Sequence, residues 1–499
     1  LGANIDASGT ANTAVWGANG FTPIGTKAVP FTGQFDGLGH VVTSLNSSTS
    51  TSATAASLFG ATSATANLRN IGIVAPVISS SIASGAYGYV SGLVGLNNGK
   101  VNNAYVSGGT ITSIGAVNMG GLVGYNYGTV SNSSNSSTLL VTNKLDSSLG
   151  GLVGKASTTS KIINSYNTGT VTGTLITAGG LVGINNGSIT GSFNTGAVMA
   201  GVDAGGLVTS NRTATGLISN SFNTGAVSGS GNVGGLAGFT SNPSQVNNSY
   251  STGSVTSLGL NSISNSNTTT GGLVGHNKGQ INNSYATGSV VGVSGTGGLS
   301  GVGGVVGLNG VAGVMTNVYS SGSVSLASGA TGTLGGVAGL MTAASSSISG
   351  GYFNLTLNPG MPGVGSNTGP GTITAVTGLT ATEMQTGSNF GTFNFTTTTG
   401  LAGNNWVMVD TDGTLNNAGG VLGATGPMAA AEYNTTINSS HQLQLMAMNL
   451  AGNYTLGRDI NAATTGLSTD VWNGATFVPV GTSTAAPFTG TLDGAGHVI

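Results

Sequence analysis

Hydrophobic residues along this chain come in short clusters that recur at long intervals and follow no helical period. The most regular cluster is the tetrapeptide G-L-V-G or a close relative, whose successive copies start 26 to 37 residues apart. A second apolar stretch follows, which contains an aromatic residue in most units, and Asn-Gly and Thr-Gly turns separate the stretches. Short apolar runs bounded by such turns predict three short β-strands per unit. The nine copies begin at Gly92, Gly121, Gly151, Gly180, Gly206, Gly235, Gly272, Gly304 and Gly336.

Two further rows of residues keep the same period. The aromatic row is Tyr105, Tyr166, Phe193, Phe222, Tyr250, Tyr285, Tyr319 and Tyr352, with Ser134 in the place of one ring. The asparagine row, two positions earlier, is Asn103, Asn132, Asn164, Asn220, Asn248, Asn283 and Asn317, with Gly191 and Gly350 interrupting it. Stacked units would bring each row into register, so we expect structural ladders of amides and of rings. We assign a different set to turns with positive φ: Asn97, Asn126, Asn185 and Asn277.

A unit of three short strands cannot bury its apolar side chains alone. Stacking each unit on the next pairs the backbone groups and encloses a continuous core. The sequence therefore predicts an all-β fold, a right-handed parallel β-helix (β-solenoid) with about 30 residues per coil. If the whole chain wound in this way, it would make roughly 15 coils.

A longer repeat joins the two ends of the chain. The stretch from Leu1 to Val42 returns from Leu456 to Ile499, with Trp16 matched by Trp472. We therefore expect a segment of a longer tandem array and divide it into residues 1–55 (first opening), 56–355 (repeat body), 356–455 (irregular closing and linking segment, still β-helical in part) and 456–499 (second opening). Only "ATEMQTGSNF" (381–390) and "HQLQLMAMNL" (441–450) could be helical.

Composition narrows the classes of function. Charged residues make up 4% of the 499 residues, the formal net charge is −2, and cysteine is absent. Without a basic patch, nucleic acid is not expected as a partner. Apolar residues are scattered, so no membrane insertion is expected in this segment.

The repeated units resemble the GLUG motif of bacterial surface proteins, because G-L-V-G is followed by N-S-Y-x-T-G. The openings, with "PFTGQFDGLGHVV" and "PFTGTLDGAGHVI", resemble the segment that precedes GLUG arrays in filamentous haemagglutinin-like adhesins. This resemblance implies an extracellular or cell-surface protein, secreted as a long stalk or fibre with an adhesive role. Low charge, small flat faces and open coil ends favour self-association along or between β-helices, because an uncapped end exposes unpaired backbone groups. Host or surface glycans are the second partner hypothesis.

Candidate chemistry is sparse. Asp36 and His40, repeated as Asp493 and His497, lie four residues apart after a glycine turn. They are consistent with a turn hydrogen bond or, less simply, with a pair of metal ligands. His276 occupies a position filled by unrelated residues in other units, so we interpret it as structural. Asp410 and Asp412 begin a loop similar to a calcium loop that lacks the closing glutamate, so weak calcium binding is the only cofactor hypothesis.

An enzyme is not expected. Between residues 147 and 382 the only acid is Asp203, which rules out a carboxylate pair within that stretch. A carbohydrate-active or carbohydrate-binding β-helix is the alternative, and an active site would need Glu383, Asp410, Asp412 and Glu432 to come together. Trp16, Trp406 and Trp472 are interpreted as core residues, with sugar stacking as the alternative.

Overall fold

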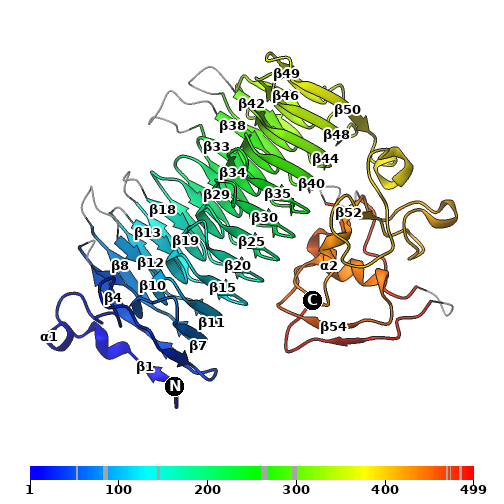
Figure 1. Cartoon of the computed structure of the whole chain (residues 1–499). Coiled ribbons are helices and arrows are strands. Elements are labelled where there is room, and N and C mark those ends of the chain that lie inside the picture. Colours follow the sequence, from blue (N-terminus) through cyan, green and yellow to red (C-terminus); the bar gives the residue numbers. More distant parts are fainter. Residues whose placement is uncertain are drawn as a thin grey trace.

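The computed structural model describes residues 1–51, 54–82, 88–115, 117–142, 147–259, 268–294, 300–467, 470–472, 474–482 and 486–499. Residues up to Leu379 form a parallel β-solenoid, which confirms the predicted fold class (Figure 1). Its strands belong to long sheets that run along the axis. Each strand pairs in parallel with the equivalent strand of the next coil.

One coil illustrates how the repeat folds. Its strands are β23 (Ala178–Gly179), β24 (Val182–Asn185), β25 (Ser188–Thr190), β26 (Phe193–Asn194) and β27 (Val198–Ala200). The prediction of three strands per unit is therefore wrong. The expected central strand is divided into β25 and β26 at Gly191, whose φ of 59° turns the chain, and β23 is an additional strand before the tetrapeptide.

The interior of the solenoid is a column of aliphatic side chains. Leu181, Val182, Ile189 and Val198 are at most 1% exposed, and their equivalents in neighbouring coils continue the same core. Each such side chain contributes about 1.5–3 kcal/mol through burial. A Cβ on Gly180 would overlap the carbonyl oxygen of Gly206 in the next coil. Glycine is needed in the tetrapeptide because the two backbones approach this closely.

The first opening forms the N-terminal end of the solenoid. It contributes β1 (Ile5–Asp6), α1 (Thr13–Trp16), β2 (Gln34–Asp36), β3 (Val41–Thr43) and β4 (Asn46–Thr49). Strands β2 and β3 both pair with the long strand β7 (Asn67–Val74), and β1 pairs with β3. The opening is therefore the first layer of the stack.

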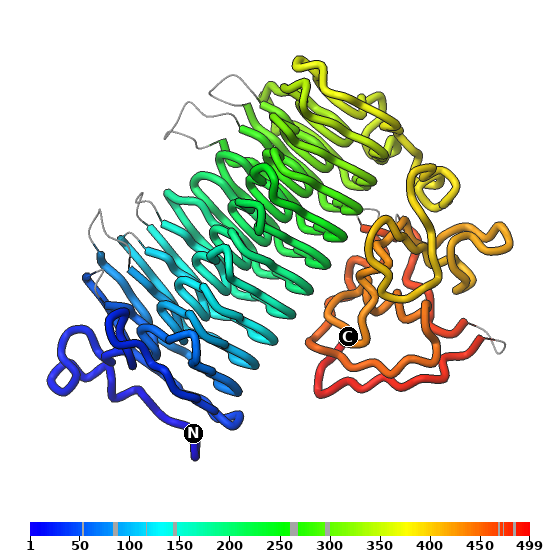
Figure 2. Tube along the Cα trace, viewed as in Figure 1, coloured from blue at the N-terminus to red at the C-terminus, as the bar shows by residue number. Residues whose placement is uncertain are grey.

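The solenoid ends with β49 (Val364–Asn367) and β50 (Thr372–Leu379), which pair with β47 (Ala338–Met341) and β48 (Ser347–Asn354). One of its sheets has 11 strands in the described part of the chain, so the expectation of roughly 15 coils is wrong. After β50 the chain reverses. Residues 380–499, called the C-terminal segment below, lie beside the solenoid and do not extend it (Figure 2).

The C-terminal segment is mostly irregular. Strand β51 (Trp406–Val407) pairs antiparallel with β52 (Met428–Ala429), and β53 (Thr436–Ile437), β54 (Asn453–Leu456) and β55 (Thr491–Asp493) form a small parallel sheet. The stretch 441–450 contains most of α2 (Ser440–Gln444) and the 3-10 helix η6 (Leu445–Met448). The stretch 381–390 contains only two 3-10 turns, Glu383–Gln385 and Gly387–Asn389. No helix among the described residues is long and apolar enough to cross a membrane.

Candidate functional site

The aromatic row forms one edge of the solenoid, and the C-terminal segment packs against it. Rings of consecutive coils stack with centroids 4.7 to 5.1 Å apart and planes within 8° of parallel. The stacked rings are Tyr166, Phe193, Phe222, Tyr250, Tyr285 and Tyr319. Tyr105 lies outside this stack, because Ser134 separates it from Tyr166 and its ring lies over Gly72 of the preceding coil. The structure therefore places six of the seven rings from Tyr105 to Tyr319 in one stack.

The asparagine row has a conformational role that the sequence analysis assigned elsewhere. All seven asparagines, Asn103, Asn132, Asn164, Asn220, Asn248, Asn283 and Asn317, have φ between 47° and 51°. The two residues that interrupt the row are glycines with φ of 59° and 72°. Asparagine and glycine share this position because they adopt the left-handed conformation most easily. Positive φ was expected at Asn97, Asn126, Asn185 and Asn277, and that expectation is wrong.

The amides of this row form only isolated bonds. Asn317 donates to Asn283 over 3.3 Å, and Asn103 donates to Asn70 over 2.8 Å. The Oδ1 atoms of Asn220 and Asn248 are buried without a partner in the protein. A continuous amide ladder exists at a position that the sequence analysis did not select, directly after the aromatic residue. There Nδ2 of Asn135 donates to Oδ1 of Asn167, Asn167 donates in the same way to Asn194, and Asn194 to Asn223, over 2.8 to 2.9 Å. The signal was present in the sequence as the repeated Asn-Thr-Gly.

A buried cluster of charged groups joins the C-terminal segment to the tyrosines. His441 on α2 places Nε2 2.8 Å from the Asp470 carboxylate and Nδ1 3.2 Å from Glu432. The Tyr285 hydroxyl donates to Glu432 over 2.7 Å and lies 3.0 Å from Nδ1 of His441. All three charged side chains are at most 6% exposed. The cluster therefore ties together the solenoid, α2 and the second opening.

The electrostatics of this cluster favour a charged histidine. Burial alone lowers the pKa of His441, but the charges and hydrogen bonds of Asp470 and Glu432 outweigh it and raise the pKa to about 10. Burial, reinforced by the Glu432 charge, raises the pKa of the Tyr285 hydroxyl well above its usual value, which keeps it a hydrogen-bond donor. Both ring nitrogens of His441 lie close to carboxylates, so this geometry suits a structural contact between the two parts of the molecule better than proton transfer to a substrate.

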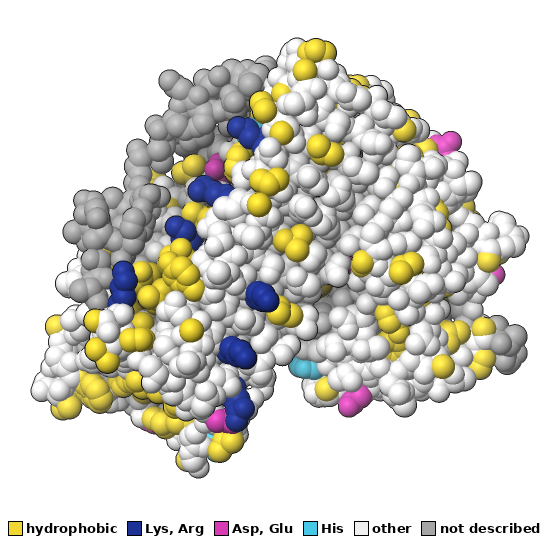
Figure 3. Space-filling view, in the orientation of Figure 1, with side chains coloured by type: hydrophobic (Ala, Val, Ile, Leu, Met, Phe, Trp, Pro, Cys, Tyr) yellow, Lys and Arg dark blue, Asp and Glu magenta, His cyan; other side chains and the backbone are white. Residues whose placement is uncertain are grey.

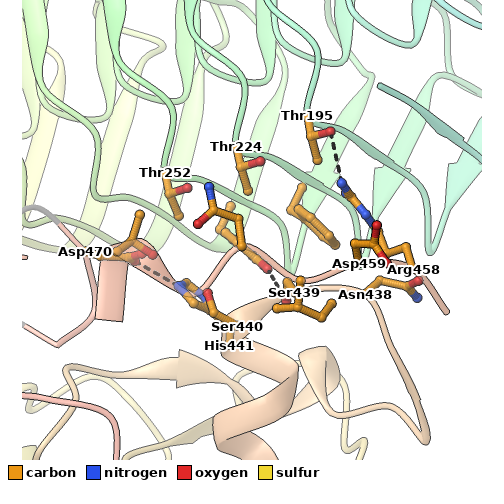
Figure 4. Close-up of a pocket in the computed structure, with 15 residues that line it drawn as sticks. Thr195, Thr224, Thr252, Asn438, Ser439, Ser440, His441, Arg458, Asp459 and Asp470 are labelled. Atoms are coloured by element: carbon orange, nitrogen blue, oxygen red, sulfur yellow. Dashed lines mark hydrogen bonds and ion pairs between the residues drawn. The ribbon is translucent and has the colours of Figure 1, made fainter. Parts of the chain in front are cut away.

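Beside the cluster lies a pocket of about 330 Å³ between the solenoid and the C-terminal segment (Figure 4). Its solenoid wall includes a row of threonines from successive coils, Thr195, Thr224 and Thr252. Arg458, from the second opening, donates to Thr195 over 3.4 Å and places its guanidinium 5.3 Å from the Phe193 ring. This cation–π contact fixes the second opening to the aromatic row.

The repeated aspartate and histidine of the two openings do not contact each other. Asp36 accepts a hydrogen bond from the Leu38 backbone over 2.9 Å, and this bond, with help from Asn70, lowers its pKa to about 2. His40 lies 3.2 Å from Asn4. In the second opening Asp493 accepts from the Ala495 backbone, and His497 lies 3.2 Å from Asp459. In both copies the aspartate thus fixes the turn, as the simpler interpretation held, whereas the histidine ring contacts a residue 36 or 38 positions earlier.

The remaining candidate residues are spread over separate places. His276 lies between Phe239 and Leu308 in register, and burial, with the charge of Lys278, lowers its pKa to about 4. Its buried Nε2 has no partner in the protein. The hydrogen bonds of Asp410 and Asp412 go largely to Thr414 and to backbone N–H groups of the same turn, and those of Glu383 to Thr380.

These acids do not meet Glu432 in a single cluster. In the described part of the chain, no group of three or more acidic or histidine side chains is arranged to hold a metal ion. Weak calcium binding stays a prediction. Trp406 and Trp472 are fully buried, whereas Trp16 is 42% exposed.

Comparisons with known proteins agree with the repeat analysis. The sequence model of the GLUG motif matches residues 146–172 and 266–291. Halomucin of Haloquadratum walsbyi (strain DSM 16790 / HBSQ001) is 33% identical over 113 residues, which are 23% of this chain and 1% of halomucin. No solved structure matches the chain. The molecule is therefore a parallel β-solenoid that contains GLUG repeats. The resemblance to filamentous haemagglutinin-like adhesins stays a prediction.

Proposed function

We propose that this chain is a structural repeat segment of a long extracellular surface protein, where it acts as an adhesin stalk or fibre-forming rod. The observation that carries the proposal is a regular solenoid followed in the same chain by a second copy of its own opening. Parallel backbone pairing from coil to coil makes such a body stiff along its axis. Similarity to the GLUG motif and to halomucin supports an assignment to a repeat region of a surface protein.

We propose a mechanical role without catalysis or a resident cofactor. Charged residues are few in the solenoid body, and its buried polar groups include neutral amides that bond to one another, such as those of Asn167, Asn194 and Asn223. In the C-terminal segment the buried histidine and carboxylates bond to one another and to tyrosine, with few hydrogen-bonding positions left for a substrate.

Electron microscopy tests this proposal. The purified chain should form short rods about one solenoid in length, and an antibody against it should label extended material outside the producing cells. Polymers of the purified chain would favour the fibre, and separate rods would favour the stalk. Label confined to the cell interior, or particles without an elongated shape, would contradict the proposal.

Carbohydrate binding is a second candidate because of one groove. A groove of about 580 Å³ runs between the asparagine row and the C-terminal segment. It is lined among others by Asn103, Asn132, Asn164 and Asn220 and by Tyr166 and Phe222. Amide groups can donate hydrogen bonds to the hydroxyls of neutral glycans and accept hydrogen bonds from them. An array of neutral glycans tests this role. Binding by the unmodified chain and its loss in Asn132→Gly would support the role, because glycine keeps the backbone conformation.

A further inference from the structure

The N-terminal end of the solenoid carries an apolar pocket of about 340 Å³, lined among others by Leu1, Ile5, Trp16, Phe21 and Phe35. Hydrophobic side chains are concentrated there on the molecular surface (Figure 3). Trp16 is 42% exposed and Ile5 is 44% exposed. Exposed apolar surface of this kind is typical of a surface that another element covers.

The same end carries a strand edge that is open. Strand β2 pairs with β7 on one side, with Phe35 opposite Leu68. On the other side the carbonyl oxygen of Asp36 accepts a hydrogen bond from the Leu1 ammonium over 2.6 Å, and no described strand pairs there. An unpaired edge of this kind can receive a further strand.

In the second opening, the equivalent strand edge and apolar surface are covered by the segment that precedes them. Strand β55 is the counterpart of β2, and its equivalent edge pairs with β54: Asn453 lies opposite Thr491, Tyr454 opposite Leu492 and Thr455 opposite Asp493. The counterparts of the pocket residues pack in one cluster with the segment that precedes them. Leu456, Ile460 and Phe477 of the second opening meet Ile437, Leu443 and Met446 in that cluster.

A polar contact completes the interface. Trp472, the counterpart of Trp16, is fully buried. Its indole donates to Oε1 of Gln444 over 3.2 Å, and the Val478 backbone N–H donates to the same oxygen over 2.9 Å. Nε2 of Gln444 donates to the Val478 carbonyl over 3.0 Å. The corresponding Trp16 and Thr22 of the first opening are exposed.

We propose that the first opening is the docking surface for residues 436–455 of a second copy of this module, joined to it head to tail. In this joint, Asn453, Tyr454 and Thr455 of the second copy pair with Gln34, Phe35 and Asp36. Leu443 and Met446 of that copy cover the apolar pocket, and its Gln444 binds Trp16. The joint repeats, between modules, the interface that the second opening already makes within the chain. The inference rests on the proposed function, since only an array of modules brings the two surfaces together.

The absence of cysteine allows a direct test by cross-linking. The test protein is a tandem chain of residues 1–455 followed directly by residues 1–499. It carries Asn453→Cys in the first module and Gln34→Cys in the second, at two exposed positions. A short bifunctional thiol reagent should link the pair within the chain. The positive control is Asn453→Cys with Thr491→Cys in the last module, which are paired in the structure. In the negative control, Leu38→Cys replaces Gln34→Cys, and it should not link.

Tryptophan quenching gives an independent reading. In the single chain one of three tryptophans is exposed. If the joint forms, one of the five tryptophans of the tandem should be open to a neutral quencher, and if it does not form, two should be. Gln444→Ala in the first module should increase quenching of the second Trp16.

Two results together would overturn the joint. Two tryptophans would be open to the quencher, and the thiols introduced by Asn453→Cys and Gln34→Cys would not link although the positive control links. Rods seen by electron microscopy in that same sample would leave the proposed function standing. Absence of rods together with a formed link would instead contradict the proposed function and keep the joint.

Discussion

The solenoid body and the C-terminal segment differ in the polar groups that they bury. The body repeats neutral pairs, such as Asn167 to Asn194, in one coil after another. The C-terminal segment uses a single charged cluster, in which His441 lies between Glu432 and Asp470. Neutral ladders lose a small part of their bonding when one member is changed. A single buried ion cluster has no second copy to take over its role.

This contrast indicates where each part of the molecule is vulnerable. Stability in the body is spread over interfaces between neighbouring coils. Docking of the C-terminal segment depends on a few contacts at the aromatic row, including the hydroxyls of Tyr250 and Tyr285. We therefore expect the two parts to respond separately to mutation and to pH.

The largest effect should follow from His441→Ala. It leaves Glu432 and Asp470 buried without a cation, which costs about 3–5 kcal/mol. Hydrogen exchange should show that residues around α2 and β54 lose protection while the solenoid keeps it. The matched control is His497→Ala, because His497 is partly exposed and bonded to the exposed Asp459. If the C-terminal segment is equally protected from hydrogen exchange in His441→Ala and in His497→Ala, the cluster has no role in docking.

Raising the pH should weaken the same contact. The pKa of His441 in the folded chain is about 10, above its ordinary unfolded value of about 6.5. The stabilising charge is therefore fully present below pH 6.5 and is lost as the pH rises toward 10, by up to roughly 1.4 kcal/mol per pH unit. Protease sensitivity of the C-terminal segment measured between pH 6.5 and 10 checks this. A flat profile, or the same slope in His441→Ala, would count against it.

Within the body, Asn194→Ala should cost about 2–3 kcal/mol. The change removes the acceptor of Asn167 and the donor to Asn223, and it leaves the Gly196 N–H without its side-chain partner. Chemical denaturation measures the loss. Asn223→Ser is the milder control, since Ser251 already holds the equivalent place in the next coil. Equal losses in the two variants would show that the amide ladder adds little.

The smallest effect per site should separate conformation from hydrogen bonding in the asparagine row. Asn220→Ala with Asn248→Ala should lower stability by about 1–2 kcal/mol per site, because alanine disfavours positive φ. The corresponding pair of glycine substitutions should change stability by less than about 1 kcal/mol in total. Thermal melting compares the pairs. Unchanged stability in the alanine pair would contradict a conformational role, and an equal loss in the glycine pair would restore the amide hypothesis.

The repeat body was predictable because its contacts join equivalent residues of neighbouring repeats. The period of G-L-V-G identified a solenoid, and the ring register followed from it, since equivalent residues of adjacent coils must become neighbours. Details within a coil were less accessible. Asparagine suits both a left-handed bend and an amide ladder, so the sequence alone assigned positive φ to Asn97 and missed the ladder through Asn194.

Periodicity in the sequence was enough to specify the solenoid, its core column and the presence of two equivalent openings, because a periodic sequence imposes periodic contacts. The reversal of the chain after Leu379, and the meeting of His441 and Asp470 with Tyr285, became visible only in the folded molecule. Those two residues are 156 and 185 positions from Tyr285. His441 lies outside the repeated segments, and Asp470 stands where the first opening has Ala14, so no period in the sequence could bring them together. The same reversal buries Trp472 and leaves its counterpart Trp16 exposed, because burial depends on which neighbour packs against a motif as well as on the motif itself.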